Sequence, residues 1–419
     1  MRYQCSLFGS LVWRLVAASF VLTGGLLAAE RPILESLGAD PRTGTAAAVI
    51  VGRTALAHTA QLFPANADGK MPPAKADKQA EALFDSLERV LKSVDSGLDQ
   101  VVRLNVYLSE NTVTPAVQTQ LHKRFSGQKV LPAVTYAVTR LPQGNLMALD
   151  AVAASSAKID KVTHKQIVGA KCGGPAGAAH VTLLPPGRAV YISGQAEPGK
   201  TMAEATRKTL AGLQRTLKHI GLDKAEIVQV KSFMQPTTDA SQVDASQVDA
   251  EISSFFAGMS IPACTHLEWI GGSPSIETEL VVWAPAGTAH DGEKGSARFE
   301  YLPWLPVSPN FCRMTIVDQS RAIYIGGIYA RTTETPEAEV RDTLRQLRDL
   351  LKLAGSDFDH LAKATYYPST DDTSNKLNTI RPEFYNPQRP PAASKAVVKG
   401  TGRADRNLTI DFIAVTPRK

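Results

Sequence analysis

Cysteine and aromatic residues are scarce in this chain of 419 residues, which has four cysteines and only 6% phenylalanine, tryptophan and tyrosine. No two cysteines stand at the Cys-x-x-Cys spacing, so neither a disulfide scaffold nor a zinc knuckle is expected, and no cofactor is implied. Basic runs with interleaved aromatic residues are also missing, and the formal net charge is only +6. We therefore expect no nucleic-acid partner.

The most continuous apolar run lies at the start of the chain. Arg2 and Arg14 precede the apolar stretch, which covers residues 15–27. Small residues follow at its end. A basic start, a short apolar middle and small residues at the end are typical of a secretory signal peptide, which we place at residues 1–29. Because the stretch is short for a bilayer span, a retained membrane anchor is the less favoured alternative. The sequence thus predicts an exported protein, periplasmic or extracellular.

The rest of the chain contains a pattern that occurs three times. Each copy has a short apolar strand, an amphipathic helix that ends near a glycine, a second strand, a second helix, a Pro-Ala pair and two final strands. The glycines, at which we expect left-handed helix ends, are Gly97, Gly221 and Gly355. The pairs are Pro132-Ala133, Pro262-Ala263 and Pro391-Ala392. The predicted order is therefore β-α-β-α-β-β in each copy.

This pattern resembles the RidA/YjgF family of reactive-intermediate deaminases, also called L-PSP endoribonucleases. The resemblance covers residues 44–156, 175–285 and 310–417, and Ser193-Gly194-Gln195 is among its best-matched motifs. It implies an α+β, chorismate-mutase-like fold with a mixed sheet and two helices on one face. In the family, three such subunits form a trimer with a central barrel, and the ligand clefts lie between neighbouring subunits. Three linked copies therefore predict an intramolecular pseudo-trimer and a monomeric chain.

The resemblance also implies two cleft residues, and both have changed here. An arginine directly after the Pro-Ala pair holds the substrate carboxylate in the family. The positions in this chain are Val134, Cys264 and Ala393. A glutamate on the last strand is thought to orient the attacking water in the family. Its positions here are Ala148, Glu277 and Thr409. We therefore expect a non-catalytic or small-molecule-binding member of the family. A divergent enamine or imine deaminase-type hydrolase that acts only in the second copy is the alternative.

The second copy carries the candidate catalytic residues. Cys264 and His266 alternate onto one face of a predicted strand with Glu268, and Glu277 retains the family's acid. A thiol, an imidazole and a carboxylate could form a thiolate nucleophile with its base, or three ligands of a metal. The alternative is a buried apolar cysteine, a surface histidine and a solvated glutamate. The first reading predicts that Ser193, Cys264, His266 and Glu277 share one cleft.

The candidate substrate-binding residues lie in the second and third copies. Ser193, Gly194 and Gln195 match the family motif, and Lys395 follows Ala393 by two residues on the same strand face. A lysine there could bind a carboxylate as a point charge, or it could simply protect an exposed sheet edge. Residues 239–243 and 244–248 repeat the same five letters, which we interpret as a tandem duplication in a loop or helix start.

Overall fold

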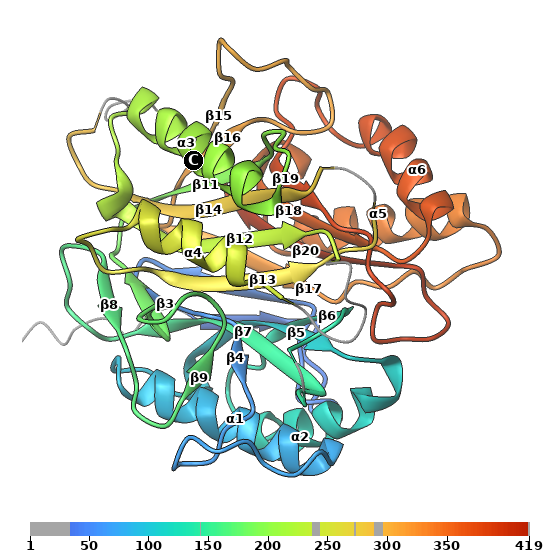
Figure 1. Cartoon of the computed structure of the whole chain (residues 1–419). Helices are drawn as coiled ribbons and strands as arrows, with labels where there is room; N and C mark the ends of the chain where they lie inside the picture. Colours follow the sequence, from blue (N-terminus) through green and yellow to red (C-terminus); the bar gives the residue numbers. More distant parts are fainter. Residues whose placement is uncertain (1–33, 143, 237–243, 272–273, 289–295, 418–419) are drawn as a thin grey trace, which may run out of the picture. The chain divides into compact units, whose positions relative to one another are not determined.

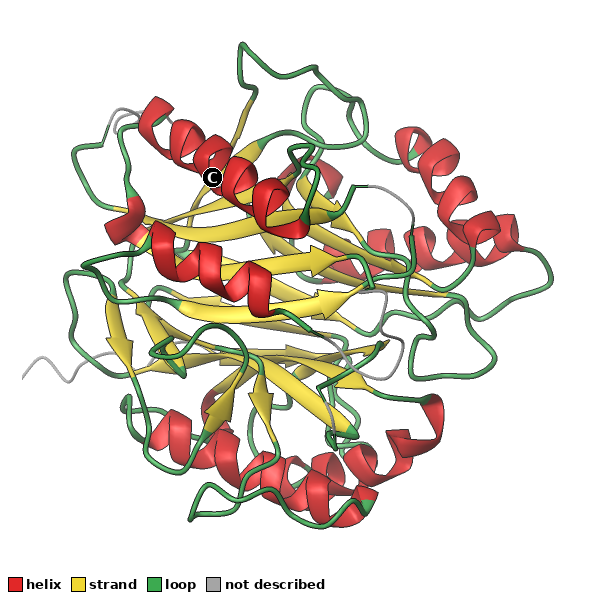
Figure 2. Cartoon of the chain, in the orientation of Figure 1, coloured by secondary structure: helices red, strands yellow, loops and turns green. Residues whose placement is uncertain are grey.

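Three β-sheets lie inside a layer of helices (Figure 1), and Figure 2 shows the helices on the outer faces of the sheets. The structure, a computed structural model, describes residues 34–142, 144–236, 244–271, 274–288 and 296–417. The predicted signal peptide at residues 1–29 and Cys5 lie outside these residues, as does the whole first half of the duplicated segment, residues 239–243. No helix among the described residues is long and apolar enough to cross a membrane.

The first sheet has the strand order β6-β5-β7-β3-β10-β8, and α1 (Ala76–Lys92) and α2 (Thr114–Phe125) cover it. Its strands are β3 (Ala55–Thr59), β5 (Val101–Leu108), β6 (Ala133–Val138), β7 (Met147–Ser155), β8 (Thr163–Lys165) and β10 (Val181–Leu184). The short strands β4 (Leu62–Phe63) and β9 (Lys171–Cys172) pair beside it. Strand β6 runs parallel to β5, while the other pairings are antiparallel.

The second and third sheets follow the same plan. The second has the order β13-β12-β14-β11-β16-β15 and the third the order β1-β2-β17-β20-β18-β19. Strands of the second are β11 (Arg188–Gln195), β12 (Ile227–Met234), β13 (Ala263–Glu268), β14 (Ile276–Ala284), β15 (Ala297–Glu300) and β16 (Met314–Asp318). Strands of the third are β1 (Leu34–Leu37), β2 (Ala48–Gly52), β17 (Arg321–Gly326), β18 (Leu361–Pro368), β19 (Ala392–Lys395) and β20 (Leu408–Val415). Their helices are α3 (Met202–His219) and α4 (Ser246–Phe255), then α5 (Pro336–Leu353) and α6 (Asp371–Ile380).

Each sheet contains a strand from another part of the chain: β10 in the first sheet and β16 in the second come from later parts, and β2 in the third comes from the start of the described residues. β2 directly precedes β3, yet β2 pairs with β17 of the third sheet while β3 pairs with β10. In the same way β16, which directly precedes β17, pairs with β11 of the second sheet. The order within each stretch is therefore β-β-α-β-α-β-β, and the predicted order lacked this first strand. Local pattern did not reveal it because its partner lies far away in the sequence.

The helix ends confirm two of the three predicted left-handed glycines. Gly221 and Gly355 have φ of 73° and 74°, and the residue after each donates a backbone hydrogen bond to the carbonyl five residues back. The prediction for Gly97 was wrong: Asp95 takes this conformation instead, with φ of 52°. Helix α1 ends at Lys92, so Asp95 lies three residues beyond it, one more than each glycine lies beyond its helix. Ser96, which follows Asp95, donates the same kind of backbone hydrogen bond, to the Leu91 carbonyl five residues back. Aspartate tolerates this region better than most non-glycine residues.

Apolar contacts hold the three sheets together along their inner faces. One inner cluster contains Val51, Val152, Tyr191 and Val281, and so draws on all three sheets. Buried ion pairs connect the same sheets: Arg103 Nη1 lies 2.7 Å from Asp411 Oδ1, and Lys363 Nζ lies 3.0 Å from Glu279 Oε1. Cross-sheet pairing of this kind favours one arrangement of the sheets, because a shifted register would leave buried charges unpaired.

Candidate functional site

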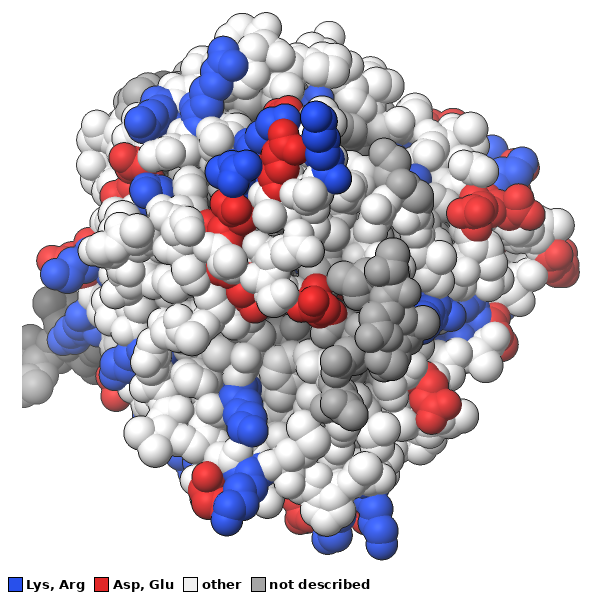
Figure 3. Space-filling model, viewed as in Figure 1, with Lys and Arg blue, Asp and Glu red and all other residues white. Residues whose placement is uncertain are grey.

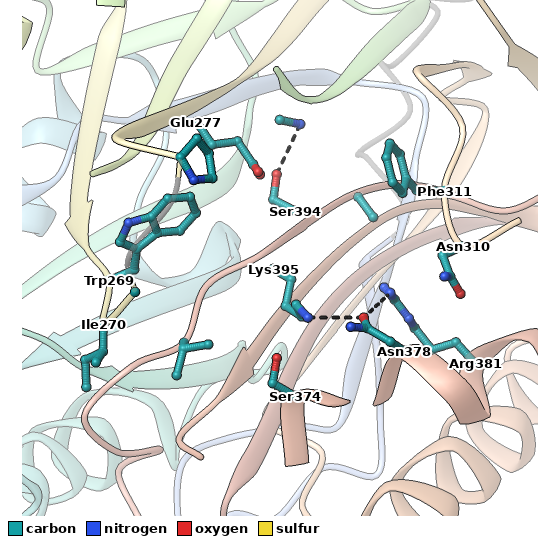
Figure 4. Close-up of a pocket in the computed structure, with 15 residues that line it drawn as sticks. Trp269, Ile270, Glu277, Asn310, Phe311, Ser374, Asn378, Arg381, Ser394 and Lys395 are labelled. Carbon is teal, nitrogen blue, oxygen red and sulfur yellow. Dashed lines mark hydrogen bonds between the residues drawn. The ribbon is translucent and has the colours of Figure 1, made fainter. Parts of the chain in front are cut away.

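A pocket of about 540 Å³ lies where the second sheet meets the third (Figure 4). Gly194 of β11 and Glu277 of β14 form one wall. Across from them stand Ser394 and Lys395 of β19, with Asn378 of α6 and Arg381 just after it. Trp269 and Phe311 add aromatic surface to the lining. The pocket therefore joins a carboxyl group, two cations and apolar rings, which is a common composition for a small-molecule site.

Glu277 sits tightly against the backbone of β11. A Cβ atom at Gly194 would lie 1.9 Å from Glu277 Oε1, so this glycine makes room for the carboxyl group. The Gly194 amide donates a hydrogen bond of 3.2 Å to Ser394 Oγ, which ties the two sheets together at the pocket. Burial raises the pKa of Glu277 to about 7, against the lowering effects of Ser394 and Lys395. Such a carboxyl group can gain or lose a proton near neutral pH.

The opposite wall carries two positive charges that share one amide. Lys395 Nζ donates to Asn378 Oδ1 at 3.1 Å, and Arg381 Nη2 donates to the same oxygen at 2.9 Å. Among the described residues, neither cation has a carboxylate within 4 Å, although Arg381 is only 5% exposed. Arg381 also lies over the Tyr366 ring, 4.7 Å from its centroid. Burial, and then the charge of Arg381, lower the pKa of Lys395 to about 8.

The four residues that the sequence placed in one cleft do not come together. In the strand pairing, Glu277 stands opposite Phe233 of β12, and Phe233 stands beside Leu267 of β13. Paired residues project from the same face of a sheet and neighbours along a strand from opposite faces. Cys264 and His266 are three positions and one position from Leu267, so they project from the face opposite to Glu277. The prediction of a shared Cys264, His266 and Glu277 cleft was therefore wrong.

Cys264 is packed into the interior on the helix side of the second sheet. It is fully buried, and its Sγ would lie 3.2 Å from a Cβ atom at Gly174. Burial raises the pKa of the Cys264 thiol well above its ordinary value, and the charge of Asp249 adds to this effect. A thiolate nucleophile is thus disfavoured at this position.

The neighbours of Cys264 on β13 have structural partners. His266 Nε2 lies 2.9 Å from Asp249 Oδ1 of α4, and Glu268 binds Arg140, with 2.6 Å between Nη2 and Oε2. No group of three metal-ligating side chains with suitable geometry occurs among the residues that the structure describes. The hypothesis of a metal held by this strand face therefore has no support from the geometry.

Of the motif Ser193-Gly194-Gln195, Gly194 alone lines the pocket. Ser193 Oγ donates to the Cys312 carbonyl at 2.6 Å and accepts from the Ala393 amide at 2.8 Å. Gln195 Nε2 donates to Thr216 Oγ1 of α3 at 2.8 Å, on the helix side. Ser193 therefore connects strands, and Gln195 connects its strand with α3. Among the predicted substrate-binding residues, Lys395 has a side chain that reaches the pocket.

Comparison with known proteins shows a family resemblance in the first part of the described chain. The family model described as Endoribonuclease L-PSP matches residues 44–155. Residues 44–155 are therefore similar to the RidA/YjgF family. It is similar to the RutC family protein UK114 of Drosophila melanogaster, with 30% identity over 84 residues, which are 20% of this chain and 60% of the fly protein. The match therefore spans about three fifths of that relative's length.

Solved structures of RidA/YjgF proteins also resemble parts of the chain. A YjgF-family protein of Neisseria meningitidis has 20% identity and a TM-score of 0.23, with 29% of this chain and 96% of that chain covered. A YjgF/YER057c/UK114-family protein of Mycobacterium tuberculosis has 17% identity and a TM-score of 0.21, with 23% and 79% covered.

Sequence reasoning missed several residues of the pocket. Ser374, Asn378 and Arg381 follow one another at spacings of four and three residues, so they fall on one face of α6 and its continuation. This spacing was a usable signal, although Leu377, three residues after Ser374 and four before Arg381, lies directly beside the stripe. Trp269 and Phe311 lie in connecting segments, where no periodic pattern marks them.

Positions equivalent to Lys395 differ at the other two sheet junctions. Each lies three residues after the alanine of a Pro-Ala pair, and they hold Tyr136 and His266. Tyr136 is 8% exposed and packs against Gly402, and His266 is bound to Asp249. The three junctions are therefore chemically distinct, and the one with Glu277 and Lys395 places a carboxyl group and two cations around a pocket.

Proposed function

We propose that this chain is an exported RidA/YjgF-family protein that binds a small carboxylate-bearing molecule in the pocket between Glu277 and Lys395. The observation that carries the proposal is the pair of cations, Lys395 and Arg381, which share one amide oxygen and have no carboxylate partner among the described residues. A buried guanidinium without a counter-ion is costly, and a ligand carboxylate would supply one. The face seen in Figure 3 mixes basic and acidic side chains, which suits a small-molecule ligand better than a nucleic acid.

Lys395 and Arg381 would bind the ligand carboxylate in place of the arginine that follows the Pro-Ala pair in the family. The positions directly after the Pro-Ala pairs are Val134, Cys264 and Ala393, which cannot form a bidentate contact with a carboxylate. Ala393 lines the same pocket as Arg381, so a guanidinium from the end of α6 stands near the place where the family's arginine would project. Loss of the arginine therefore does not argue against an anionic ligand at this junction.

A hydrolase of the imine or enamine deaminase type is the second candidate. Glu277 favours it, because a carboxyl group with a pKa of about 7 can serve as general acid or base at neutral pH. In this alternative, Glu277 activates a water molecule beside a ligand held by Lys395 and Arg381. The reaction would take place at this junction alone, since Ala148 and Thr409 occupy the corresponding positions elsewhere.

Binding is tested by the thermal shift of the protein lacking residues 1–29 in propanoate and in propanamide, which differ in charge. We expect stabilisation by propanoate, little by propanamide, and at least about a tenfold weaker affinity in Lys395→Met, since a charge-assisted contact is worth about 1.5–3 kcal/mol. Affinity should fall between pH 6 and 9, because Glu277 becomes negative and Lys395 neutral in that range. Lys376→Met, at an exposed lysine on α6, is the control. Equal response to both compounds would reject the proposal.

Hydrolysis is tested separately with enzymatically generated 2-iminopropanoate. Acceleration that is lost in Glu277→Gln, while propanoate binding persists, would establish the second candidate. No acceleration would leave the binding function as the sole reading.

The assembly is proposed to be three tandem RidA-like copies, at residues 44–156, 175–285 and 310–417, which form a pseudo-trimer within one chain. The shared plan of the three sheets and the ring of borrowed strands support this. Light scattering on the protein lacking residues 1–29 should then give the mass of one chain, whereas a stable trimer would contradict it.

A further inference from the structure

Lys395 differs from the two buried lysines of the sheets, Lys363 and Lys231, in lining a pocket, where its side chain donates to a neutral amide. Lys363 is paired with Glu279 at 3.0 Å, and Lys231 donates to the Tyr367 hydroxyl at 3.0 Å in the interior. Lys395 instead lines the pocket, partly exposed, and donates to the neutral amide of Asn378 (Figure 4). A lysine in this setting, beside another cation, is the arrangement that activates an amine as a nucleophile.

The second cation lies at a distance that suits a short ligand. Lys395 Nζ and Arg381 Nη2 both donate to Asn378 Oδ1, at 3.1 and 2.9 Å, so the two nitrogens are no more than about 6 Å apart. In a 2-oxo acid the carbonyl carbon is bonded directly to the carboxylate carbon. A carboxylate held by Arg381 would therefore leave the carbonyl carbon within reach of Nζ.

We propose that Lys395 forms an imine with the carbonyl group of a small 2-oxo acid whose carboxylate is held by Arg381. This inference rests on the proposed binding function and adds a covalent step at the same pocket. It names a chemical class of ligand, carbonyl compounds with an adjacent carboxylate, and a modification site on this chain.

The step balances with groups present in the pocket. The neutral amine of Lys395 attacks the carbonyl carbon, and the electron pair of the C=O bond moves to oxygen, which takes a proton to give a carbinolamine. The nitrogen loses one proton, the hydroxyl oxygen takes a second proton, and the C–O bond breaks to release water as the C=N bond forms. The resulting iminium then loses its remaining N–H proton to give the imine. Glu277, on the facing wall, can donate and recover protons. One amine and one ketone give one imine and one water, without an oxidant or reductant.

The charges around Lys395 favour the neutral amine near pH 8. Burial and Arg381 lower its pKa to about 8, while Glu277 and Asp371 act in the other direction. These groups come from β14, from the segment after α6 and from α6 itself, the elements that face Nζ. About half of the lysine is therefore unprotonated at pH 8, whereas a solvent-exposed lysine is almost fully charged there.

The experiment traps the imine by reduction. The protein lacking residues 1–29 is incubated at pH 8 with pyruvate and sodium cyanoborohydride, digested and read by peptide mass spectrometry. We expect one dominant adduct, on Lys395, with a mass gain equal to pyruvate less one oxygen atom. Its rate should exceed that at the exposed Lys376 by at least about tenfold, because the amine is both less protonated and next to a bound carbonyl. Propanoate should slow it by competing for Arg381.

Variants separate the imine from binding alone. Lys395→Arg keeps the positive charge but has no primary amine that can form the adduct, so labelling at this position should vanish. Lys376 is an exposed lysine of α6 that forms an ion pair with Glu337. Lys376→Arg should leave the Lys395 adduct unchanged. If pyruvate stabilises the wild-type protein but Lys395 is labelled no faster than Lys376, the imine proposal fails and the binding function survives. If neither pyruvate nor propanoate stabilises the protein and pyruvate does not label it, the imine proposal and the binding function both fail.

Discussion

The pocket depends on a single missing side chain at Gly194. Any Cβ atom there would overlap Glu277, since the separation of 1.9 Å is far below van der Waals contact. The backbone amide of the same residue binds Ser394 across the junction of the sheets. Gly194 thus has two roles, and both follow from how closely β11 approaches β14 and β19.

Gly194→Ala is expected to displace the Glu277 carboxyl group and to weaken carboxylate binding. Overpacking of this kind costs about 1–3 kcal/mol of stability. The measurement is the free energy of unfolding in urea together with propanoate affinity. Gly127→Ala is the control, because a Cβ atom at Gly127 has no heavy atom within 4 Å. Equal effects of the two substitutions would contradict the tight contact.

Glu277 should also leave a signature in the pH dependence of stability. Its pKa is raised from 4.5 to about 7 in the folded protein. Between these values the folded state holds a proton that the unfolded chain has lost, so stability falls as pH rises through this window and levels off above it. Because Glu277 is partly exposed to the pocket, the loss should be on the order of 1–2 kcal/mol rather than the full shift.

Glu277→Gln removes this titration, so its stability relative to wild type should rise from pH 5 to pH 8. Urea unfolding at four pH values measures the difference, with the exposed Glu110→Gln as the control. A difference that does not change with pH would contradict the raised pKa.

At the scale of single elements, helix ends and strand faces are set by local chemistry. Thr335 stands before Pro336 at the start of α5, and its Oγ1 accepts a hydrogen bond of 3.1 Å from the Ala338 amide. Thr201 and Thr370 begin α3 and α6 in the same way. A side-chain oxygen at this place satisfies a backbone amide that the helix itself leaves unpaired.

Thr335→Ala should therefore destabilise the protein by about 1 kcal/mol, with a lower midpoint of urea unfolding and an unchanged slope. Thr119, inside α2, binds the Pro115 carbonyl instead and caps no helix start. Thr119→Ala should cost little, since alanine is the better helix former. A loss of equal size in both variants would mean that the cap contributes nothing.

At the scale of the whole molecule, the three sheets depend on one another for strands. β10 and β11 are neighbours in the sequence, yet β10 completes the first sheet and β11 belongs to the second, where β16 flanks it. The ion pair of Arg103 with Asp411 spans 308 residues and connects the first sheet with the third. These contacts bind the beginning of the described chain to its end.

A fragment of residues 175–285 should consequently fail to fold as a monomer. The fragment lacks β3, the pairing partner of β10, and β16, a pairing partner of β11. The backbone hydrogen-bonding groups of both strands would therefore be exposed. Circular dichroism with urea unfolding and light scattering would test this, with the protein lacking residues 1–29 as reference. A monomeric fragment that unfolds cooperatively would contradict the prediction, whereas self-association would agree with it.

Local sequence was sufficient for the helices and most strands. The apolar positions Leu83, Leu87, Val90 and Leu91 recur at helical spacing, and the structure buries all four in α1. Periodicity works here because the side of a helix that is buried depends on residues within the same segment. The family resemblance was likewise local, since it depended on short motifs in a constant order.

Tertiary structure decided the site. Alternation along β13 correctly placed Cys264 and His266 on one face, but the pairing of β13 with β12 and of β12 with β14 determines that Glu277 projects from the other face. Glu277 and Lys395, 118 positions apart in the sequence, meet because the second and third sheets pack side by side. No periodicity within a segment encodes which distant strand becomes its neighbour, because that choice depends on packing and buried charge pairing over the whole chain.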